Sequence, residues 1–223
     1  MKNGLNVLMF VAAFSCITVQ AAEVPLYETG PAEDSSFVRF VNGSEQPLDV
    51  VASRSKSRVT LDGGRPVTDF QAIQAGKPVE GVLRQGALEK KISVTAQPGE
   101  FVTVVGLENP SEGLRTVVIH EQPDDFNALK ASVAIYNLDA QCVSAALLVA
   151  GRDIVLFEQV PENAFRRRQI NPVPLKVQLS CGGQITGKPV DLGILEAGQR
   201  YTVFLVPDGK QSRLFSTEDI VAH

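Results

Sequence analysis

Short runs of alternating apolar and polar residues follow one another along this chain, and turn-forming residues separate them. The runs are rich in valine, isoleucine, threonine and phenylalanine, and pairs such as Asn42-Gly43, Gly63-Gly64 and Pro98-Gly99 stand between them. Many short β-branched runs punctuated by such turns are typical of a β-sandwich or barrel, so the pattern predicts an all-β chain. The predicted strands are 37–41, 48–52, 57–61, 67–73, 76–83, 90–95, 100–107 and 116–120, followed by 132–138, 145–149, 153–160, 165–170, 175–180, 190–195, 200–206 and 212–216.

One of these runs occurs twice in related form. Residues 37–42 read FVRFVN and residues 132–137 read SVAIYN, so the copies share apolar positions and a final asparagine. Each copy is followed further along the chain by a strand that a glycine begins, Gly99 in one case and Gly198 in the other. The repeat predicts two tandem β-sandwich modules of jelly-roll or Ig-like type. A single long sandwich is the alternative, because the copies share pattern rather than identity.

The two copies differ in length. Asn42 and Asn137 are offset by 137 − 42 = 95 residues, whereas Thr103 and Thr202 are offset by 202 − 103 = 99. An insertion inside the second copy accounts for this difference.

These patterns divide the chain into five parts. Residues 1–21 are expected to be a secretory signal peptide, and residues 22–35, which contain prolines and a glycine, an extended arm. The first sandwich module is predicted over residues 36–123 and the second over residues 131–223. Residues 124–130 begin with two aspartates that can cap a helical turn, and they are the expected connector.

The first residues have the features of an export signal. Lys2 precedes the apolar run 5–17, and small residues at positions −3 and −1 suit cleavage after Ala21. The run is shorter than the roughly 20 apolar residues that a membrane helix needs. A lipoprotein signal ending at Cys16 is the alternative, although Phe14 fits its consensus poorly. The mature chain is therefore expected to lie outside the cytoplasm.

Charge and cysteine content narrow the possible functions. Cleavage after residue 21 changes the formal net charge from −4 to −5, because the segment contains Lys2 and no acid. This acidity argues against nonspecific nucleic-acid binding, which usually needs a basic face. Cys142 and Cys181 remain, and an even pair in an oxidising compartment predicts a disulfide. A metal site built on cysteine would need further ligands nearby, so no metal or cofactor is expected.

Residues that catalysis requires are sparse. A serine esterase or acetyltransferase needs a histidine base, and the chain offers His120 and His223 without a Gly-x-Ser-x-Gly elbow. His120 adjoins Glu121 and is either a base held by that carboxylate or an ordinary surface residue. A glycosidase needs two carboxylates across a cleft, and the sequence singles out no such pair. The residues therefore predict no catalytic site.

Two basic clusters are candidate binding sites. Arg166, Arg167 and Arg168 are consecutive and lie between the two cysteines. If all three are exposed, their guanidinium groups suit bidentate contacts with carboxylates on an acidic polysaccharide or a partner. Residues 54–58 alternate basic and small polar side chains. A solvated hairpin is the alternative for both clusters.

The start of the mature chain carries a family resemblance. Leu26-Tyr27, Gly30-Pro31 and residues 35–42, SSFVRFVN, resemble the AlgF family of periplasmic alginate O-acetylation proteins, and residues 98–103 are similar to that family as well. The resemblance marks Tyr27 and Arg39 as candidate binding residues. Packing of the arm and a charge at a strand edge are their alternative roles.

The resemblance implies a function. In the AlgF family the chemistry is attributed to partner O-acetyltransferases, periplasmic and membrane-anchored, so this chain is expected to be a noncatalytic adaptor in alginate O-acetylation. Polymannuronate, an acidic polysaccharide, is a second candidate partner. An exported carbohydrate-binding or adhesion module is the alternative, although the chain has no tryptophan and three tyrosines where such modules usually present aromatic platforms. An esterase acting through His120 is the third hypothesis.

Overall fold

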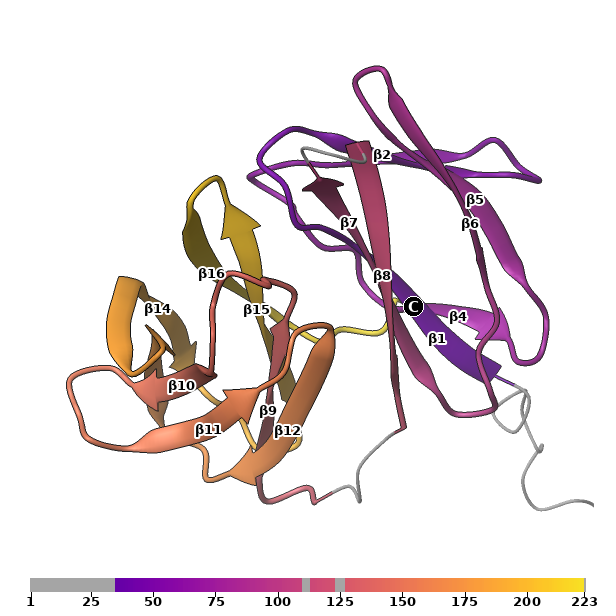
Figure 1. Cartoon of the computed structure of the whole chain (residues 1–223). Coiled ribbons are helices and arrows are strands. Elements are labelled where there is room, and N and C mark those ends of the chain that lie inside the picture. Colours follow the sequence, from indigo (N-terminus) through magenta and orange to yellow (C-terminus); the bar gives the residue numbers. More distant parts are fainter. Residues whose placement is uncertain (1–34, 110–112, 123–126, 223) are drawn as a thin grey trace, which may run out of the picture. The chain divides into compact units, whose positions relative to one another are not determined.

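The computed structural model describes residues 35–109, 113–122 and 127–222, which form β-strands joined by turns and loops (Figure 1). The expected signal peptide, the arm up to residue 34 and Tyr27 lie outside the described residues, as do the aspartates that were expected to cap a helical turn. No helix in the described ranges is long and apolar enough to cross a membrane. The prediction of an all-β fold is confirmed.

All sixteen predicted strands are present in this part of the chain, with ends that differ by a few residues. The first eight are β1 (Ser35–Asn42), β2 (Leu48–Ala52), β3 (Arg58–Leu61), β4 (Gln71–Gln74), β5 (Val79–Gln85), β6 (Leu88–Val94), β7 (Phe101–Asn109) and β8 (Gly113–Glu121). The second eight are β9 (Ala131–Asn137), β10 (Ala145–Val149), β11 (Val155–Val160), β12 (Ala164–Ile170), β13 (Pro174–Cys181), β14 (Gln184–Ile194), β15 (Arg200–Asp208) and β16 (Gln211–Glu218).

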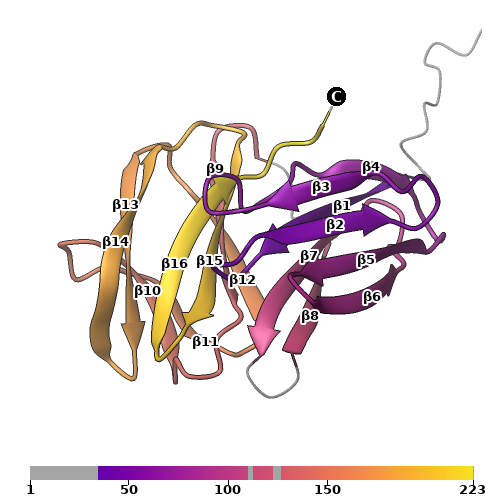
Figure 2. The same ribbon diagram turned by 90° about the horizontal axis from the view of Figure 1, so that it is seen from above.

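The topology confirms two sandwich-like modules built on one plan. The first eight strands form sheets of order β4-β1-β7-β8 and β3-β2-β5-β6, and the second eight form sheets of order β12-β9-β15-β16 and β11-β10-β13-β14. In each module the first strand pairs in parallel with the seventh, as β1 does with β7 and β9 with β15. Each strand of one module therefore has a counterpart in the other, as the sequence repeat predicted (Figure 2).

The repeated asparagine has the same structural task in both modules. Asn42 donates from its side-chain amide to the Leu61 carbonyl at 3.0 Å, and Asn137 donates to the Val160 carbonyl at 2.9 Å. Both asparagines also accept a backbone N–H two residues further on with their side-chain oxygen. The amide thus ties the end of the first strand to the end of the third, which satisfies buried backbone groups where the chain leaves the sheet.

Each module has a hydrophobic core between its two sheets. Val38, Val102 and Val104 of the β4-β1-β7-β8 sheet pack against Leu48 and Leu83 of the facing sheet. The second module repeats this arrangement around a core that contains Val133, Val203 and Val177. These residues alternate along their strands, as expected where one face of a strand meets a core.

A third core joins the modules. It consists of the opposite faces of the two inner sheets, β4-β1-β7-β8 and β12-β9-β15-β16, so four sheets stack in layers with three cores between them. Strands β1, β7, β9 and β15 are therefore buried on both faces, which explains their nearly continuous apolar sequences. The buried apolar members of this third core are Val41, Val67, Val105, Leu107, Ile119, Ala134, Tyr136, Leu138, Phe204 and Val206.

The shared core bears on the predicted domain boundaries at residues 36–123 and 131–223. Those boundaries, and the ability of the first module to fold by itself, remain predictions. A fragment ending near residue 125 would expose the apolar side chains of Val41, Val105 and Leu107, which are buried in the whole chain. Burial of such surface is worth about 25 cal/mol per Å², so we expect the fragment to be less stable than a free-standing sandwich of the same size.

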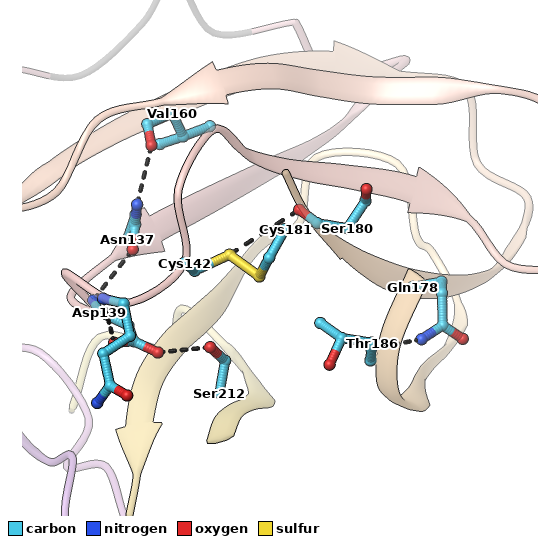
Figure 3. Close-up of a disulfide and its surroundings, with 10 residues drawn as sticks. Asn137, Asp139, Cys142, Val160, Gln178, Ser180, Cys181, Thr186 and Ser212 are labelled. Carbon is cyan, nitrogen blue, oxygen red and sulfur yellow. Dashed lines mark hydrogen bonds between the residues drawn. A yellow bond between two sulfur atoms is a disulfide. The ribbon is translucent and has the colours of Figure 1, made fainter. Parts of the chain in front are cut away.

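The predicted disulfide is present. Cys142 precedes β10, Cys181 ends β13, and their Cα atoms are 4.9 Å apart because β10 and β13 are antiparallel neighbours (Figure 3). The bridge packs with Ala145, Leu179 and Leu205 in a small cluster of its own. It constrains the second module, because both cysteines belong to it.

Removing this disulfide should destabilise the protein. The bridge closes a loop between residues 39 positions apart, for which chain entropy gives a stabilisation of about 4 kcal/mol. The double variant Cys142→Ala/Cys181→Ala should therefore lose up to about 4 kcal/mol in the free energy of unfolding measured by urea denaturation. A reductant should lower the stability of the wild type and leave that of the variant unchanged. Equal stability of the two proteins without reductant would contradict the prediction.

Candidate functional site

Charged side chains gather inside the third core. They are Arg39 on β1, Glu121 at the end of β8, Arg167 on β12, Arg200 on β15 and Asp219 after β16, and we call them the buried ion cluster. The side chains of Arg39, Glu121, Arg167 and Asp219 are at most 2% exposed. A buried charge is tolerated only when it is paired and hydrogen-bonded, so each contact within the cluster matters for the fold.

Arg39 connects both modules through one guanidinium group. Its Nη1 donates to Oδ1 of Asp219 at 2.6 Å, its Nε donates to Oγ1 of Thr103 at 3.0 Å, and its Nη2 donates to Oγ1 of Thr202 at 3.0 Å. The guanidinium also lies over the ring of Phe70, 4.3 Å from the ring centre. Its contacts are therefore made within the protein, across the two inner sheets.

Arg167 completes the cluster from the second module. It forms a bidentate pair with Glu121, in which Nη2 lies 3.2 Å from Oε2, and the same Nη2 donates to Oδ2 of Asp219 at 2.9 Å. Arg200 binds the same carboxylate of Glu121 from the rim of the cluster. The hydroxyl of Tyr136 donates to Oε2 of Glu121 at 2.6 Å. Both oxygens of Glu121 are thus occupied by partners from the other module.

The environment shifts the titration of these groups. Burial alone would raise the pKa of Asp219, but the positive charges of Arg39 and Arg167 hold that pKa below its usual value. Burial alone would lower the pKa of Arg167, and the carboxylates of Asp219 and Glu121 raise it instead. Burial and the adjacent charge of Glu121 raise the pKa of Tyr136. Asp219 and Arg167 therefore keep their charges, and the phenol of Tyr136 stays neutral, across the physiological pH range.

The cluster has a pseudo-twofold arrangement that follows from the repeat. Thr103 and Thr202 occupy equivalent positions on β7 and β15, and both accept a hydrogen bond from Arg39. Glu121 lies beside Phe101 of β7, as Asp219 lies beside Arg200 of β15. The equivalent of Arg39 on β9 is Ala134, whose small side chain leaves room for the guanidinium of the other module.

The residues after β16 fasten the C-terminal segment to the first module. The backbone N–H of Phe70 donates to the Ile220 carbonyl at 2.8 Å, and the N–H of Ala222 donates to the Phe70 carbonyl at 2.9 Å. Together with the pair between Asp219 and Arg39, these bonds make residues 219–222 a strap across the two modules. The strap and the buried ion cluster therefore set the relative position of the two modules.

The structure separates the three consecutive arginines. They lie on strand β12 rather than at a hairpin tip, and neighbouring side chains on a strand point to opposite faces. Arg166 and Arg168 are exposed, whereas the side chain of Arg167 is 2% exposed. The expectation of three exposed arginines is therefore wrong for Arg167. Arg39 is likewise buried, so neither of these two candidate binding residues reaches an external ligand.

The remaining candidates lie at the surface or outside the described ranges. Residues 54–58 form an exposed turn and the start of β3. His120 is 45% exposed, and its Nδ1 lies 3.1 Å from Oε1 of Glu100. The carboxylate that holds this histidine is thus Glu100, not the adjacent Glu121, because Glu121 points to the opposite face and into the buried ion cluster. Tyr27 is outside the described residues.

A cleft of about 530 Å³ lies where the loops of the two modules meet. The loops after β1 and β9 line it together with the ends of β7 and β15. Arg115 is its basic residue, and it already contacts Glu162 at 3.5 Å and the Leu138 carbonyl at 3.0 Å. The acidic residues of the lining are Glu45, Glu108, Asp139, Glu162 and Asp208. This cleft repels polyanions, since its carboxylates outnumber its guanidinium.

The described part of the chain is thus an all-β protein of two duplicated sandwich modules, held together by a charged and an apolar layer. Comparison with protein families identifies the family of this chain. The model of the family described as alginate O-acetyl transferase AlgF matches residues 7–202. The chain belongs to the AlgF family, and this membership links it to alginate O-acetylation.

Several solved structures are similar to this chain. The C-terminal domain of AlgF from P. aeruginosa is 22% identical, with a TM-score of 0.35 over 40% of this chain and 98% of that one. A putative cell adhesion protein from Bacteroides ovatus is 9% identical, with a TM-score of 0.27 over 84% of this chain and 99% of that one. The TIE protein of Bacillus anthracis is 7% identical, with a TM-score of 0.27 over 78% of this chain and 34% of that one. No curated protein matches the chain.

Removing one member of the buried ion cluster should strongly destabilise the protein. Asp219→Asn removes the charge that compensates Arg39 and Arg167, and uncompensated buried charges typically destabilise a protein by about 3–5 kcal/mol. We expect a loss of that size in urea denaturation. Asp191→Asn is the matched control, because Asp191 pairs with Lys176 at 2.9 Å while its side chain is 54% exposed. The control should unfold like the wild type, and a similar effect of both substitutions would contradict the role of the cluster.

The same pair of proteins should respond differently to acid. Because the folded pKa of Asp219 is lowered, its contribution is present above the unfolded pKa of about 3.9 and is lost as pH falls through the folded pKa. The stability difference between the wild type and Asp219→Asn should therefore be full at neutral pH and shrink below about pH 4. A difference that stays constant down to strong acid would mean that the pKa of Asp219 is the same in the folded and unfolded states, which would contradict the prediction.

Proposed function

We propose that this protein is a noncatalytic, periplasmic accessory component of alginate O-acetylation that works with partner acetyltransferases. The observation that carries the proposal is the AlgF family match, which spans both modules up to residue 202. Acetyl transfer needs a nucleophile or base at the reacting atoms, and the partner enzymes supply it. This chain contributes a rigid surface on which the partners assemble.

The way the chain uses its charged groups supports this role. Arg39, Arg167 and Asp219 are occupied with one another inside the protein, where they join the modules. His120 is held at its Nδ1 by Glu100, whose other carboxylate oxygen accepts the Gln97 N–H at 2.8 Å. Glu100 thereby orients the histidine while closing a turn. In both arrangements the charged side chains bind other groups of the protein, as expected for a scaffold.

Direct contact with the polymer is a second candidate function, favoured by Arg166 and Arg168. Both arginines are exposed on edge strand β12, and the Nη1 of Arg168 donates to the Leu156 carbonyl at 3.0 Å, which steadies its side chain. Exposed guanidinium groups suit the carboxylates of a polyuronate. The acidic cleft at the meeting of the modules is unsuited to the same ligand.

The accessory role can be tested through His120. In cells that lack this protein, polymer acetyl content should fall, and a gene carrying His120→Ala should restore it as well as the wild type does. The purified protein should have no acetylesterase turnover above background. If His120→Ala failed to restore acetylation while its circular dichroism and thermal midpoint matched the wild type, the noncatalytic role would be wrong.

Polymer contact can be tested through the exposed arginines. Arg166→Ser/Arg168→Ser should weaken binding of polymannuronate by roughly tenfold, because two exposed pairs contribute at most about 1 kcal/mol each. Calorimetry at low and physiological salt should show the wild-type affinity falling as salt rises. Lys90→Ser/Lys91→Ser is the control with the same loss of charge elsewhere, because both lysines are exposed and belong to neither basic cluster. Equal affinities for all three proteins would remove Arg166 and Arg168 from polymer binding.

A further inference from the structure

The two outermost sheets of the stack differ in how they meet solvent. The β3-β2-β5-β6 sheet and the β11-β10-β13-β14 sheet are equivalent in the duplicated plan, and each turns one face to the core of its own module. The other face of each is directed outward. Since both sheets have the same topology, each outward position in one module has a matched position in the other. A difference between matched residues therefore does not arise from a difference in fold.

In the first module a row of charges crosses the outward face. Asp49 of β2 pairs in register with Arg84 of β5, and Arg84 pairs with Glu89 of β6. The Nε of Arg84 lies 3.0 Å from Oε2 of Glu89, and Thr60 donates to Oδ1 of Asp49 at 2.6 Å. Cross-strand opposite charges of this kind are usual where a sheet faces water.

In the second module the matched row is uncharged. Ala146 of β10 pairs with Ser180 of β13, and Ser180 pairs with Ile185 of β14. These residues replace Asp49, Arg84 and Glu89 respectively, because Leu48 and Ala145 are matched by their pairing with Leu61 and Val160. Ile185 is 60% exposed, so a large aliphatic side chain stands in water where the first module has a carboxylate.

The next row of this face is also neutral, and a hollow opens beside it. Leu148 pairs with Val155 on one side and with Gln178 on the other. Gln178 is buried, and its amide donates to the carbonyls of Thr186 and Gly187. A hollow of about 370 Å³ lies over Leu148 and Gln178, with Ile185 among its lining residues and Arg152 and Asp153 at its loop edge. We call this surface the neutral face.

Arg152 and Asp153, at the edge of the neutral face, carry opposite charges and could pair with the same two residues of a second copy. Arg152 and Asp153 are adjacent and exposed, and no ion pair within the described ranges engages either of them. A two-fold axis beside them would set Arg152 of one copy against Asp153 of the other, and Asp153 against Arg152 in return. Isologous interfaces use one patch twice in this way.

We propose that the neutral face is the interface of a homodimer of this protein. A second copy suits it better than an acidic or basic partner, because the centre of the face is uncharged and the charges around it balance. Arg152 and Asp153 lie at the loop edge, and Lys176 pairs with Asp191 further along β13 and β14. The protein already buries equivalent sheet faces of its own two modules against each other in the third core. Dimerisation through the neutral face repeats that packing between chains and extends the stack of sheets.

Sedimentation equilibrium of the whole mature protein tests the proposal. The wild type should dimerise with a Kd in the micromolar range, as expected for an interface near the lower size limit. Ile185→Asp should raise that Kd by about tenfold or more, because it places a carboxylate at the apolar centre. Leu129→Asp is the matched control: Leu129 is 79% exposed and lies before β9, away from the neutral face, so dimerisation should be unchanged.

Charge reversal tests the two-fold geometry. Arg152→Asp should weaken the dimer, since the introduced carboxylate would face Asp153 of the other copy. The double variant Arg152→Asp/Asp153→Arg should restore dimerisation, because the pairs re-form with opposite order. A monomeric wild type at all concentrations, or a dimer insensitive to Ile185→Asp, would overturn the proposal. Failure of the double variant to recover, with thermal midpoints unchanged, would overturn the pairing of Arg152 with Asp153.

Discussion

The pairing of Arg39 with Asp219 is the interaction on which the arrangement of the two modules depends. The guanidinium originates in the first strand of the first module, and its carboxylate follows the last strand of the second. Apolar packing alone is non-directional and would allow the inner sheets to slide over each other. A buried charge must meet its partner, so only one registry of the two sheets satisfies Arg39, Arg167, Glu121 and Asp219 together.

The shared plan of the two modules explains why such a cluster can form. Equivalent threonines, Thr103 and Thr202, lie on either side of Arg39, and equivalent acids, Glu121 and Asp219, lie at the ends of equivalent strands. The copies then differ where symmetry would place like charges together, because β9 carries Ala134 at the position of Arg39. The two modules are therefore complementary at their shared layer rather than identical. Because the charges of one module find their partners in the other, the two inner sheets are held in one fixed arrangement.

The outward faces diverged in a different way. At one end of the stack the cross-strand row is Asp49, Arg84 and Glu89, and the matched row at the other end is Ala146, Ser180 and Ile185. The scaffold role that we propose requires such inequivalent surfaces, since each partner must bind at one place. On β12, Arg167 pairs inside the protein, whereas Arg166 and Arg168 are exposed and are our candidates for contact with the polymer.

The sequence by itself determined the all-β class, the positions of the strands, the duplication and the disulfide. Alternation, turn residues, the repeated asparagine and an isolated pair of cysteines are local signals, and each follows from chemistry within a few residues or one matched pair. The start of β14 at Gln184 was missed, because Gly187 and Pro189 are tolerated on an edge strand although they interrupt its pattern.

Only the tertiary structure decided which charges are buried. Arg166, Arg167 and Arg168 look alike in sequence, and the pleat of β12 turns the middle one toward Glu121 and Asp219. Arg39 and Asp219 are 180 positions apart in the chain, so no local pattern relates them. The nearly continuous apolar residues of β1, β7, β9 and β15 are typical of strands with two buried faces. What covers the second face is the other module, and this depends on contacts that form only when both modules are folded.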